Sequence, residues 1–300
     1  MQGPRYVGLV EQRPFGRSGL QVSVQGLGAG HIGGPDQTLR EAVRVLDAAL
    51  DLGINFVDTA RGYGQSEERI GRWLGAHRSG IVISTKVGYD IAGEDDWSRG
   101  AVVGGVDEAL RTLRTDVLDV VFLHSCDLDT LQRGEAIEAL LACQQSGKVR
   151  VAGYSGENEA LAWAVASGNF GAVQTSVNIV DQASLHHTLR AAAEQGLGVV
   201  AKRPLANVAW RHRERPAGVY GVEYWDRLQA AGLQPYEGDW TETAARFAAF
   251  APGVSTAIVG TSSPRHLAEA AVAVEKGSLP KDEIRRWYDA YRVHNWPGDV

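Results

Sequence analysis

Along this chain, short runs of apolar and β-branched residues alternate with longer segments in which apolar residues recur every three or four positions. The first pattern is typical of buried strands and the second of helices with one buried face. The expected strands are residues 22–27, 55–57, 81–85, 117–123, 150–154, 172–176, 198–201 and 256–259. The expected helices are residues 39–52, 67–77, 103–114, 131–146, 157–167, 184–195, 241–250 and 264–276. This alternation predicts a parallel sheet.

Capping residues mark several of the expected helix ends. Ser66 and the two glutamates after it have the order of an N-cap followed by an acidic first turn. Gly168, Gly196 and Gly277 lie just past the ends of three expected helices, where glycine readily takes the left-handed conformation.

The whole chain, residues 1–300, is expected to form one α/β domain, a single (β/α)₈ TIM barrel. The alternative is a doubly wound open sheet, which usually carries a G-x-G-x-x-G turn between its first strand and first helix. Here Gly28, Gly30 and Gly33 are followed by a proline and an aspartate and do not open a helix directly. The closed barrel is therefore the prediction.

Two segments fall outside the alternation. Residues 205–240 form an extended loop, and loops of this length are commonly functional or contain structure of their own. Within it, residues 221–231 have the pattern of an extra helix. Residues 278–294 are expected to form a C-terminal helix rich in aromatic residues.

Polar residues follow three successive expected strands. The second strand leads into Asp58, with Tyr63 in the loop after it, the third leads into Lys86 and the fourth into His124. Active sites of parallel α/β barrels lie at the C-terminal ends of the strands. We therefore expect a carboxylate, a phenol, an ammonium and an imidazole to meet at one mouth of the barrel.

These four groups suit a proton transfer at a carbonyl. Tyr63 can donate a proton, although the pKa of a free tyrosine is about 10. An ammonium at Lys86 favours the phenolate and so eases the transfer, and Asp58 can hold that ammonium in place. His124 can hydrogen-bond the substrate oxygen. None of the four is a hydride source, so a nicotinamide cofactor is implied.

Composition narrows the class of protein. The net charge is −6 with a pI near 5.8, which argues against a nucleic-acid partner. Cys126 and Cys143 form no C-x-x-C pair and are expected to be reduced thiols. No long apolar run suggests a signal peptide or a membrane span, so we expect a cytoplasmic protein without a membrane partner.

The motifs resemble those of the aldo-keto reductase superfamily. The resemblance extends from about Phe15 to about Val274. It is carried by residues 55–64 (NFVDTARGYG) with Glu67, Ile70 and Gly71, and by residues 84–88 (STKVG), 119–124 (DVVFLH) and 151–155 (VAGYS). It implies a (β/α)₈ barrel, NADP-linked reduction of aldehydes or ketones, and roles for Asp58, Tyr63, Lys86 and His124 like those argued above.

The resemblance also implies a set of cofactor contacts. The matching positions are Gly28, Ala29, Gly30, Asp58, Ser155, Gln174, Lys202, Arg203, Leu205, Gly260, Thr261, Ser262, Arg265, His266 and Glu269. Ser155 and Gln174 match residues that bind the nicotinamide amide. Lys202 and Arg203 lie where many members have a tyrosine that stacks on the nicotinamide. Here the stacking is lost, or Arg203 stacks in its place, or the basic pair reaches a phosphate.

The adenosine end departs from the family pattern. The Lys and Arg that clamp the 2′-phosphate of NADP in well-known members are Gly260 and His266 here, and Arg265 is the adjacent substitute. Thr261 and Ser262 can donate to a phosphate at a helix N-terminus. NADP(H) is therefore the expected cofactor and NAD(H) the alternative.

Two other functions compete with a carbonyl reductase acting on a small molecule. A cofactor-binding regulatory subunit resembling the potassium-channel β-subunits would keep the same four residues. A metal-dependent barrel hydrolase or isomerase would use Asp58 and His124 as ligands, but a third ligand is missing and Lys86 would repel a cation. We expect no metal. The sequence leaves open whether the substrate is an aldehyde, a sugar alcohol or a lactol, and leaves open the oligomeric state.

Overall fold

Eight parallel strands close into a barrel in the computed structural model, which describes residues 10–298. Around the barrel they follow the order β10, β3, β4, β5, β6, β7, β8, β9, so each strand lies beside its neighbour in sequence. Their bounds are β3 (Gln25–Gly28), β4 (Phe56–Asp58), β5 (Val82–Val87), β6 (Leu118–His124), β7 (Val149–Ser155), β8 (Ala172–Ser176), β9 (Gly198–Lys202) and β10 (Thr256–Gly260). The predicted fold class is confirmed.

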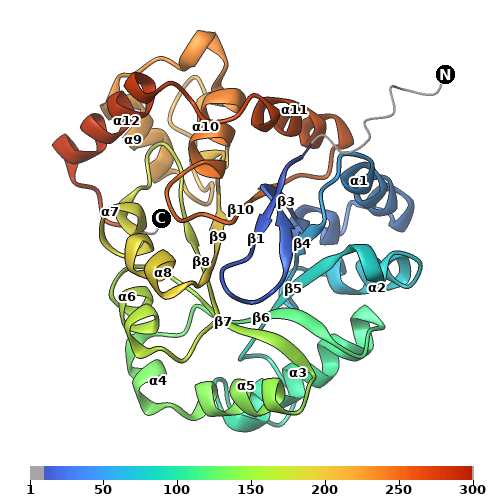
Figure 1. Cartoon of the computed structure of the whole chain (residues 1–300). Coiled ribbons are helices and arrows are strands. Elements are labelled where there is room, and N and C mark those ends of the chain that lie inside the picture. The colour runs from blue at the N-terminus through green and yellow to red at the C-terminus, as the bar shows by residue number, and fades with distance from the viewer. Residues whose placement is uncertain (1–9, 299–300) are drawn as a thin grey trace.

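The helices form a ring around the barrel (Figure 1). The α-helices are α1 (Leu39–Asp51), α2 (Ser66–Leu74), α3 (Arg99–Leu113), α4 (Leu128–Arg133), α5 (Glu135–Gln145), α6 (Asn158–Ser167), α7 (Ala183–His187), α8 (Leu189–Gln195), α9 (Glu223–Ala231), α10 (Trp240–Ala249), α11 (Pro264–Glu275) and α12 (Lys281–His294). Short 3₁₀ turns are η1 (Ala29–Gly33), η2 (Arg78–Gly80), η3 (Ala206–Arg211) and η4 (Tyr236–Gly238). No helix within residues 10–298 is both long and apolar enough to cross a membrane.

The barrel interior is a packed core. Alternate residues of successive strands point inward and form one cluster, which includes Phe56, Val120, Phe122 and Val200. Phe15 joins this cluster from outside the barrel strands, and its ring centroid lies 5.7 Å from that of Phe56. The apolar side chains between the strands and the helix ring form a second, larger cluster. The interior is thus filled, and chemistry is restricted to the barrel ends.

The expected strand 22–27 is two separate strands. Its first part is β2 (Gln21–Ser23), which pairs antiparallel with β1 (Gln12–Pro14), and only the second part, β3, belongs to the barrel. The hairpin brings Phe15 and Val22 into the interior cluster. A hydrophobic run alone could not show this division, because both parts are buried and extended.

Two predicted helices are each interrupted. The segment 131–146 divides at Gly134, whose φ of 82° ends α4 and begins α5. The segment 184–195 divides at Thr188, which has non-helical backbone angles between α7 and α8. The N-cap prediction for Ser66 is also wrong. Gln65 occupies the cap, and the Ser66 hydroxyl instead donates to the Ala29 carbonyl over 2.9 Å and accepts from Thr59.

The other helix-end predictions are confirmed. Gly168 and Gly196 take left-handed φ values of 70° and 76° at the C-caps of α6 and α8. Gly277 has a φ of 77° just beyond α11. At these three positions the chain leaves the helix in a conformation that costs glycine little.

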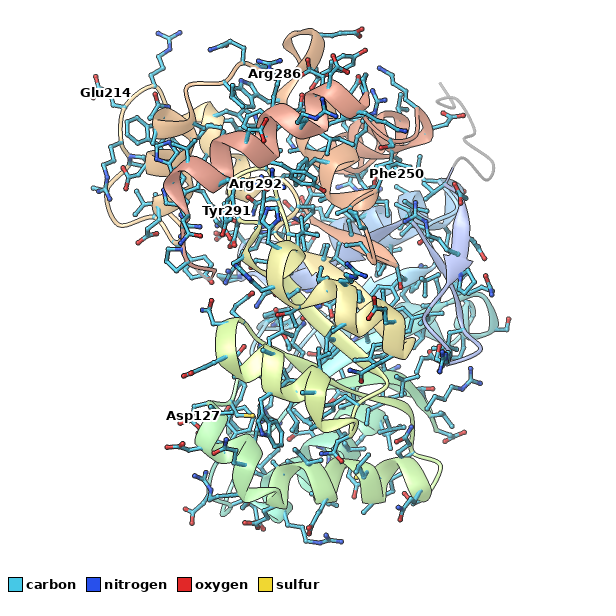
Figure 2. All side chains as sticks on the ribbon, turned by 60° about the vertical axis from the view of Figure 1, so that its left-hand side comes forward. Asp127, Glu214, Phe250, Arg286, Tyr291 and Arg292 are labelled. Atoms are coloured by element: carbon cyan, nitrogen blue, oxygen red, sulfur yellow. The ribbon has the colours of Figure 1, made fainter. Side chains whose placement is uncertain are left out.

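The extended loop contains the expected extra helix, α9, together with η3 and η4. Its side chains form a cluster with α10 and α12 that includes Tyr224, Phe247 and Trp287. Figure 2 shows α12 lying over this end of the molecule, with Tyr291 and Arg292 on it. The Tyr291 ring stacks on His186 of α7 with centroids 5.4 Å apart. The loop and the C-terminal helix thus stabilise each other and cover one side of the barrel.

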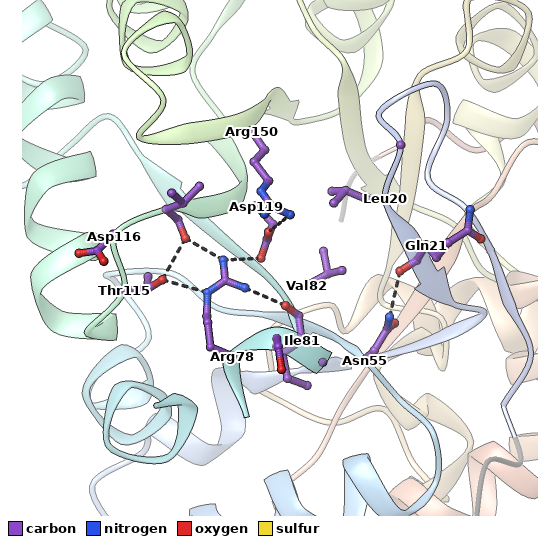
Figure 3. A pocket seen from close by; sticks show the side chains of 14 residues that line it. Leu20, Gln21, Asn55, Arg78, Ile81, Val82, Thr115, Asp116, Asp119 and Arg150 are labelled. Atoms are coloured by element: carbon purple, nitrogen blue, oxygen red, sulfur yellow. Dashed lines mark hydrogen bonds and ion pairs between the residues drawn. The ribbon is translucent and has the colours of Figure 1, made fainter. Parts of the chain in front are cut away.

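A polar hollow of about 440 Å³ lies at the N-terminal ends of β4, β5 and β6 (Figure 3). Within it, Arg78 forms a 2.9 Å ion pair with Asp119 and donates to the carbonyls of Ile81 and Val117. Arg150 pairs with the other Asp119 oxygen over 3.2 Å. Burial raises the pKa of the Asp119 carboxyl, and its hydrogen bond and two cations only partly offset this. The polar groups here thus bind one another at the N-terminal end of the barrel.

The contact between α2 and α3 yields a prediction on stability. A Cβ added at Gly71 would lie 2.1 Å from the Thr112 carbonyl oxygen, so Gly71→Ala must push the two helices apart. We expect the free energy of unfolding to fall by about 1–3 kcal/mol in urea denaturation. Gly75→Ala is the matched control, because that position is right-handed and has no atom within 4 Å. It should be neutral or stabilise by up to about 1 kcal/mol. Equal effects of the two variants would contradict this account of the contact.

Candidate active site

The four predicted proton-transfer residues meet at the C-terminal ends of adjacent strands. Asp58 is the last residue of β4, Lys86 lies near the end of β5, His124 ends β6, and Tyr63 lies in the loop between β4 and α2. All four line one cavity of about 720 Å³. Parallel strands in register bring this about, since the C-terminal ends of neighbouring strands lie at the same edge.

Asp58 and Lys86 form a buried ion pair. Each side chain is 2% exposed, and the Lys86 Nζ lies 2.7 Å from Asp58 Oδ2. The ammonium also donates to the Thr59 carbonyl over 2.8 Å. Burial by itself lowers the pKa of Lys86, but the Asp58 carboxylate and the Tyr63 oxygen outweigh it, so the net pKa is raised. Lys86 therefore stays protonated at neutral pH.

Tyr63 lies directly against this ammonium. The Lys86 Nζ is 4.7 Å from the centroid of the Tyr63 ring. A tight turn fixes the tyrosine, with its N–H donating to the Ala60 carbonyl over 3.0 Å. Gly33 allows the turn to approach η1, because a Cβ there would lie 1.8 Å from the Tyr63 carbonyl oxygen. The phenol is thus held between a cation and the cavity.

His124 is the neutral member of the group. Its ring lies edge-on to Tyr63 with centroids 6.2 Å apart, and its Nδ1 is 2.8 Å from the Tyr89 hydroxyl. Burial, together with the positive charges of Lys86 and Lys202, lowers the pKa of His124 to about 3. An imidazole in this site therefore acts through hydrogen bonds and not through charge.

Ser155 and Gln174 lie at the base of the cavity and suit a carboxamide. Gln174 donates to Asp58 Oδ1 over 3.0 Å, and its Oε1 accepts from Ser155 Oγ over 3.1 Å. Both side chains are buried. Each amide atom of Gln174 has thus used one hydrogen bond, which leaves one donor and one acceptor site. These residues fit the amide of a nicotinamide ring.

The remaining cavity wall fits the phosphates of a dinucleotide. Lys202 and Arg203 lie side by side at the end of β9 and both line the cavity. Gly28 and Gly260 face it across the β3–β10 pair, and a Cβ at Gly28 would come within 3.4 Å of Gly260. Lys202 is held by Glu157 over 3.2 Å. A ligand can therefore come close to the backbone at the two glycines while it faces two cations, and both features suit a diphosphate.

The predicted contact residues divide into two groups. Those that line the cavity are Gly28, Gly30, Asp58, Ser155, Gln174, Lys202, Arg203, Leu205 and Gly260, in addition to Tyr63, Lys86 and His124. Ala29 does not line it, because its side chain packs in the core. The others lie outside the cavity wall, either just before α11 (Thr261 and Ser262) or in its first two turns (Arg265, His266 and Glu269).

The polar residues around the start of α11 form hydrogen bonds and an ion pair with one another. Arg265 is largely exposed and pairs with Glu269 over 2.7 Å, and it also contacts the His266 ring over 2.9 Å. Thr261 Oγ1 accepts the Ser263 N–H over 3.0 Å. Arg265 is thus exposed at the helix N-terminus, with a carboxylate beside it.

Sequence reasoning missed several cavity residues. They are His31, Ser125, Pro204, Asn207, Val208, Val219 and Ile258. His31 could have been found, since it lies in the glycine-rich run after the first barrel strand. Asn207 and Val208 could not, because they face the cavity through left-handed backbone angles, with φ values of 50° and 51°. Tyr220 also lines the cavity, and Arg203 lies over its ring at 5.0 Å from the centroid.

Comparison with known proteins agrees with this geometry. A model of the Aldo/keto reductase family matches residues 26–292. The chain belongs to the aldo/keto reductase family. A holo-form aldo-keto reductase from Bacillus halodurans superposes with a TM-score of 0.81 at 27% identity, covering 94% of this chain and 96% of that one. L-galactose dehydrogenase from Arabidopsis thaliana is 27% identical over 97% of this chain and 98% of that protein.

This aldo/keto reductase is therefore an oxidoreductase, in a family that binds nicotinamide cofactors and acts on small carbonyl compounds. Another relative, named as a voltage-gated potassium channel β-subunit of Arabidopsis thaliana, is 38% identical. That match spans 40% of this chain and 39% of that protein. L-galactose dehydrogenase, by contrast, matches over nearly the full length of both chains, so the likeness as a whole favours an enzyme.

The depressed pKa of His124 predicts how stability depends on pH. In the unfolded chain the imidazole takes up a proton near pH 6.5, but in the fold it does so only near pH 3. Its contribution to stability is thus complete above pH 6.5 and is lost as the pH falls toward 3. Between pH 7 and pH 5, the free energy of unfolding should therefore fall less in His124→Gln than in the wild type, and the two decreases should differ by at most about 2 kcal/mol. Urea denaturation at the two pH values measures this. His187→Gln, which removes an exposed imidazole, is the control, and identical slopes for all three proteins would contradict the assignment.

Proposed function

We propose that this aldo/keto reductase interconverts an aldehyde or ketone with the corresponding alcohol, with Tyr63 as general acid and base and NADP(H) as cofactor. The observation that carries the proposal is the contact between the Tyr63 ring and the buried Lys86 ammonium, 4.7 Å from ring centroid to Nζ. The substrate would enter the cavity that both residues line.

In the reducing direction, Tyr63 donates its hydroxyl proton to the carbonyl oxygen. The proton loss leaves a phenolate, which the Lys86 ammonium stabilises because a neighbouring positive charge favours the ionised form. Asp58 keeps Lys86 oriented through the 2.7 Å ion pair. In the oxidising direction the phenolate takes the proton from the alcohol, and the same ammonium stays in place.

His124 orients the carbonyl oxygen toward Tyr63. Its ring is edge-on to the Tyr63 ring and lines the cavity. The low pKa keeps the imidazole neutral, so it does not compete with Tyr63 as an acid at neutral pH. General acid catalysis of this kind typically contributes about 10²–10⁴-fold to the rate.

When bound, the nicotinamide cofactor supplies or accepts the hydride at the carbonyl carbon. Ser155 and Gln174 would hold its amide, with the hydrogen-bonding capacity left to them at the base of the cavity. Lys202 and Arg203 would face its phosphates, and Gly28 and Gly260 would let it approach the backbone closely. Asp58 and His124 are engaged with Lys86, Gln174 and Tyr89, which argues against the metal-hydrolase alternative.

NADP(H) is favoured over NAD(H) by Arg265. Its guanidinium is exposed at the N-terminus of α11, where a helix end favours an anion. The Glu269 partner is 47% exposed, so a phosphate could replace it on the arginine without stranding a buried charge. His266 adjoins the same guanidinium.

Substitution of the general acid tests the proposed reaction. Tyr63→Phe should lower the turnover of a test aldehyde at least about 10²-fold, because the acid is lost while the ring and its packing remain. Quenching of protein fluorescence by NADPH should persist. Tyr288→Phe, far along the chain on α12, should keep full turnover. Retained turnover in Tyr63→Phe would exclude Tyr63 as the acid, and very slow wild-type turnover with every carbonyl tried would favour the regulatory-subunit alternative.

Cofactor choice is tested at Arg265. Arg265→Ala should raise KM for NADPH roughly tenfold or more, because a charge-assisted contact to the 2′-phosphate is lost. KM for NADH, which lacks that phosphate, should stay unchanged. Arg190→Ala is a matched control, since Arg190 forms the same kind of exposed i,i+4 pair, with Glu194 on α8. Equal rises for both cofactors would contradict the 2′-phosphate contact.

A further inference from the structure

The hydroxyl of Tyr89 contacts the candidate carbonyl-orienting residue from behind. It lies 2.8 Å from His124 Nδ1, and the two rings are tilted by 32° with centroids 5.5 Å apart. Tyr89 follows β5 in the loop that leads to α3, three residues after Lys86. The catalytic mechanism proposed above does not use this contact.

The loop is built to hold Tyr89 in this place. Gly88 has a φ of 128°, and the Trp97 ring packs so closely on it that a Cβ would lie 2.1 Å from that ring. The Trp97 N–H donates to the Gly88 carbonyl over 2.6 Å, and its ring meets Tyr89 edge-on at 6.1 Å. On the other side, Gly62 leaves room for the hydroxyl, since a Cβ there would lie 2.9 Å from it.

Arg61 fixes the same loop from the side of β4. Its guanidinium donates to the Asp90 carbonyl over 2.5 Å and pairs with Glu108 of α3 over 2.8 Å. The segments that carry Tyr63 and Tyr89 are therefore tied together. The Tyr89 hydroxyl is held on His124 from three directions.

A neutral imidazole carries one N–H, and the hydrogen bond at one nitrogen decides which nitrogen carries it. Burial raises the pKa of Tyr89, and so does the neighbouring Tyr63, so the phenol keeps its proton. A neutral phenol is a good donor and an unprotonated imidazole nitrogen a good acceptor. Within residues 10–298, His124 Nε2 has no hydrogen-bond partner in the protein, and its ring lines the cavity.

We propose that Tyr89 is a positioning residue whose hydroxyl donates a hydrogen bond to His124 Nδ1. This hydrogen bond keeps the imidazole hydrogen on Nε2, where it can bind the substrate carbonyl oxygen. The inference rests on the proposed role of His124 in carbonyl reduction. It adds that this role depends on a second tyrosine, which is not among the residues that line the cavity.

The tautomer is measured directly by NMR on enzyme labelled with ¹⁵N in its histidine rings. In the wild type, His124 should show a protonated Nε2 and an Nδ1 that accepts a hydrogen bond. Tyr89→Phe keeps the ring but removes the hydroxyl that donates the hydrogen bond. The ¹⁵N signal of His124 Nδ1 should therefore move toward that of an imidazole nitrogen that accepts no hydrogen bond. Tyr220→Phe, another tyrosine at the cavity, should leave it unchanged. A protonated Nδ1 in the wild type would overturn the inference, even where Tyr89→Phe fails to fold.

Kinetics separate positioning from packing. Tyr89→Phe should lower kcat for carbonyl reduction roughly tenfold with little change in KM for the cofactor, as expected for the loss of about one hydrogen bond. In a His124→Gln background the same substitution should change kcat by no more than about twofold, because its route of action is gone. Full additivity in the double variant would show that Tyr89 acts by packing alone.

The two proposals fail in different ways. Turnover retained in Tyr63→Phe refutes the proposed acid but leaves the His124 tautomer measurable. A protonated Nδ1 refutes the role of Tyr89 but leaves Tyr63 as the acid.

Discussion

The ion pair of Asp58 and Lys86 is the interaction on which the site depends. Both side chains are almost fully buried, and removing two charges from water costs several kcal/mol for each of them. The cost is offset only because both groups are fully engaged. Asp58 accepts from Lys86, Ser84 and Gln174, and Lys86 also donates to the Thr59 carbonyl. Loss of either partner would leave a buried unpaired charge, which typically costs about 3–5 kcal/mol.

This pair also connects distant parts of the barrel. Gln174 lies on β8, and β4 and β8 are on opposite sides of the eight-stranded ring, so the Gln174–Asp58 hydrogen bond crosses its mouth. Through Ser155 the connection continues to β7. The fixed carboxylate thus orients the ammonium beneath Tyr63 and, at the same time, the amide side chain that suits a nicotinamide. Stability and chemistry at this end depend on the same few atoms.

The opposite end of the barrel shows a different use of charge. There Asp119 is held between Arg78 and Arg150, and the polar groups satisfy one another around a hollow without a tyrosine or a histidine. The contrast follows from the parallel arrangement of the strands. In such barrels the loops after the strands form the active site, whereas residues at the opposite end serve the stability of the fold. Charge alone therefore does not identify an active site. A phenol and an imidazole beside the ion pair distinguish the C-terminal end of the barrel from this one.

The sequence by itself determined the barrel and the meeting of Asp58, Tyr63, Lys86 and His124 at one of its ends. The barrel follows from periodic burial, and the meeting follows from polar residues at strand ends or in the loop just after them. Asp58, Lys86 and His124 lie at or near the ends of β4, β5 and β6, where the hydrophobic pattern stops. The sequence could not show that two helices are interrupted at Gly134 and Thr188 or that the Ser66 hydroxyl donates to the Ala29 carbonyl. It also could not show that Asn207 and Val208 line the cavity. These depend on tertiary packing and on backbone angles that no local pattern encodes. The contact of Tyr89 with His124 was decided in the same way, because it exists only where the loop after β5 packs against the end of β6.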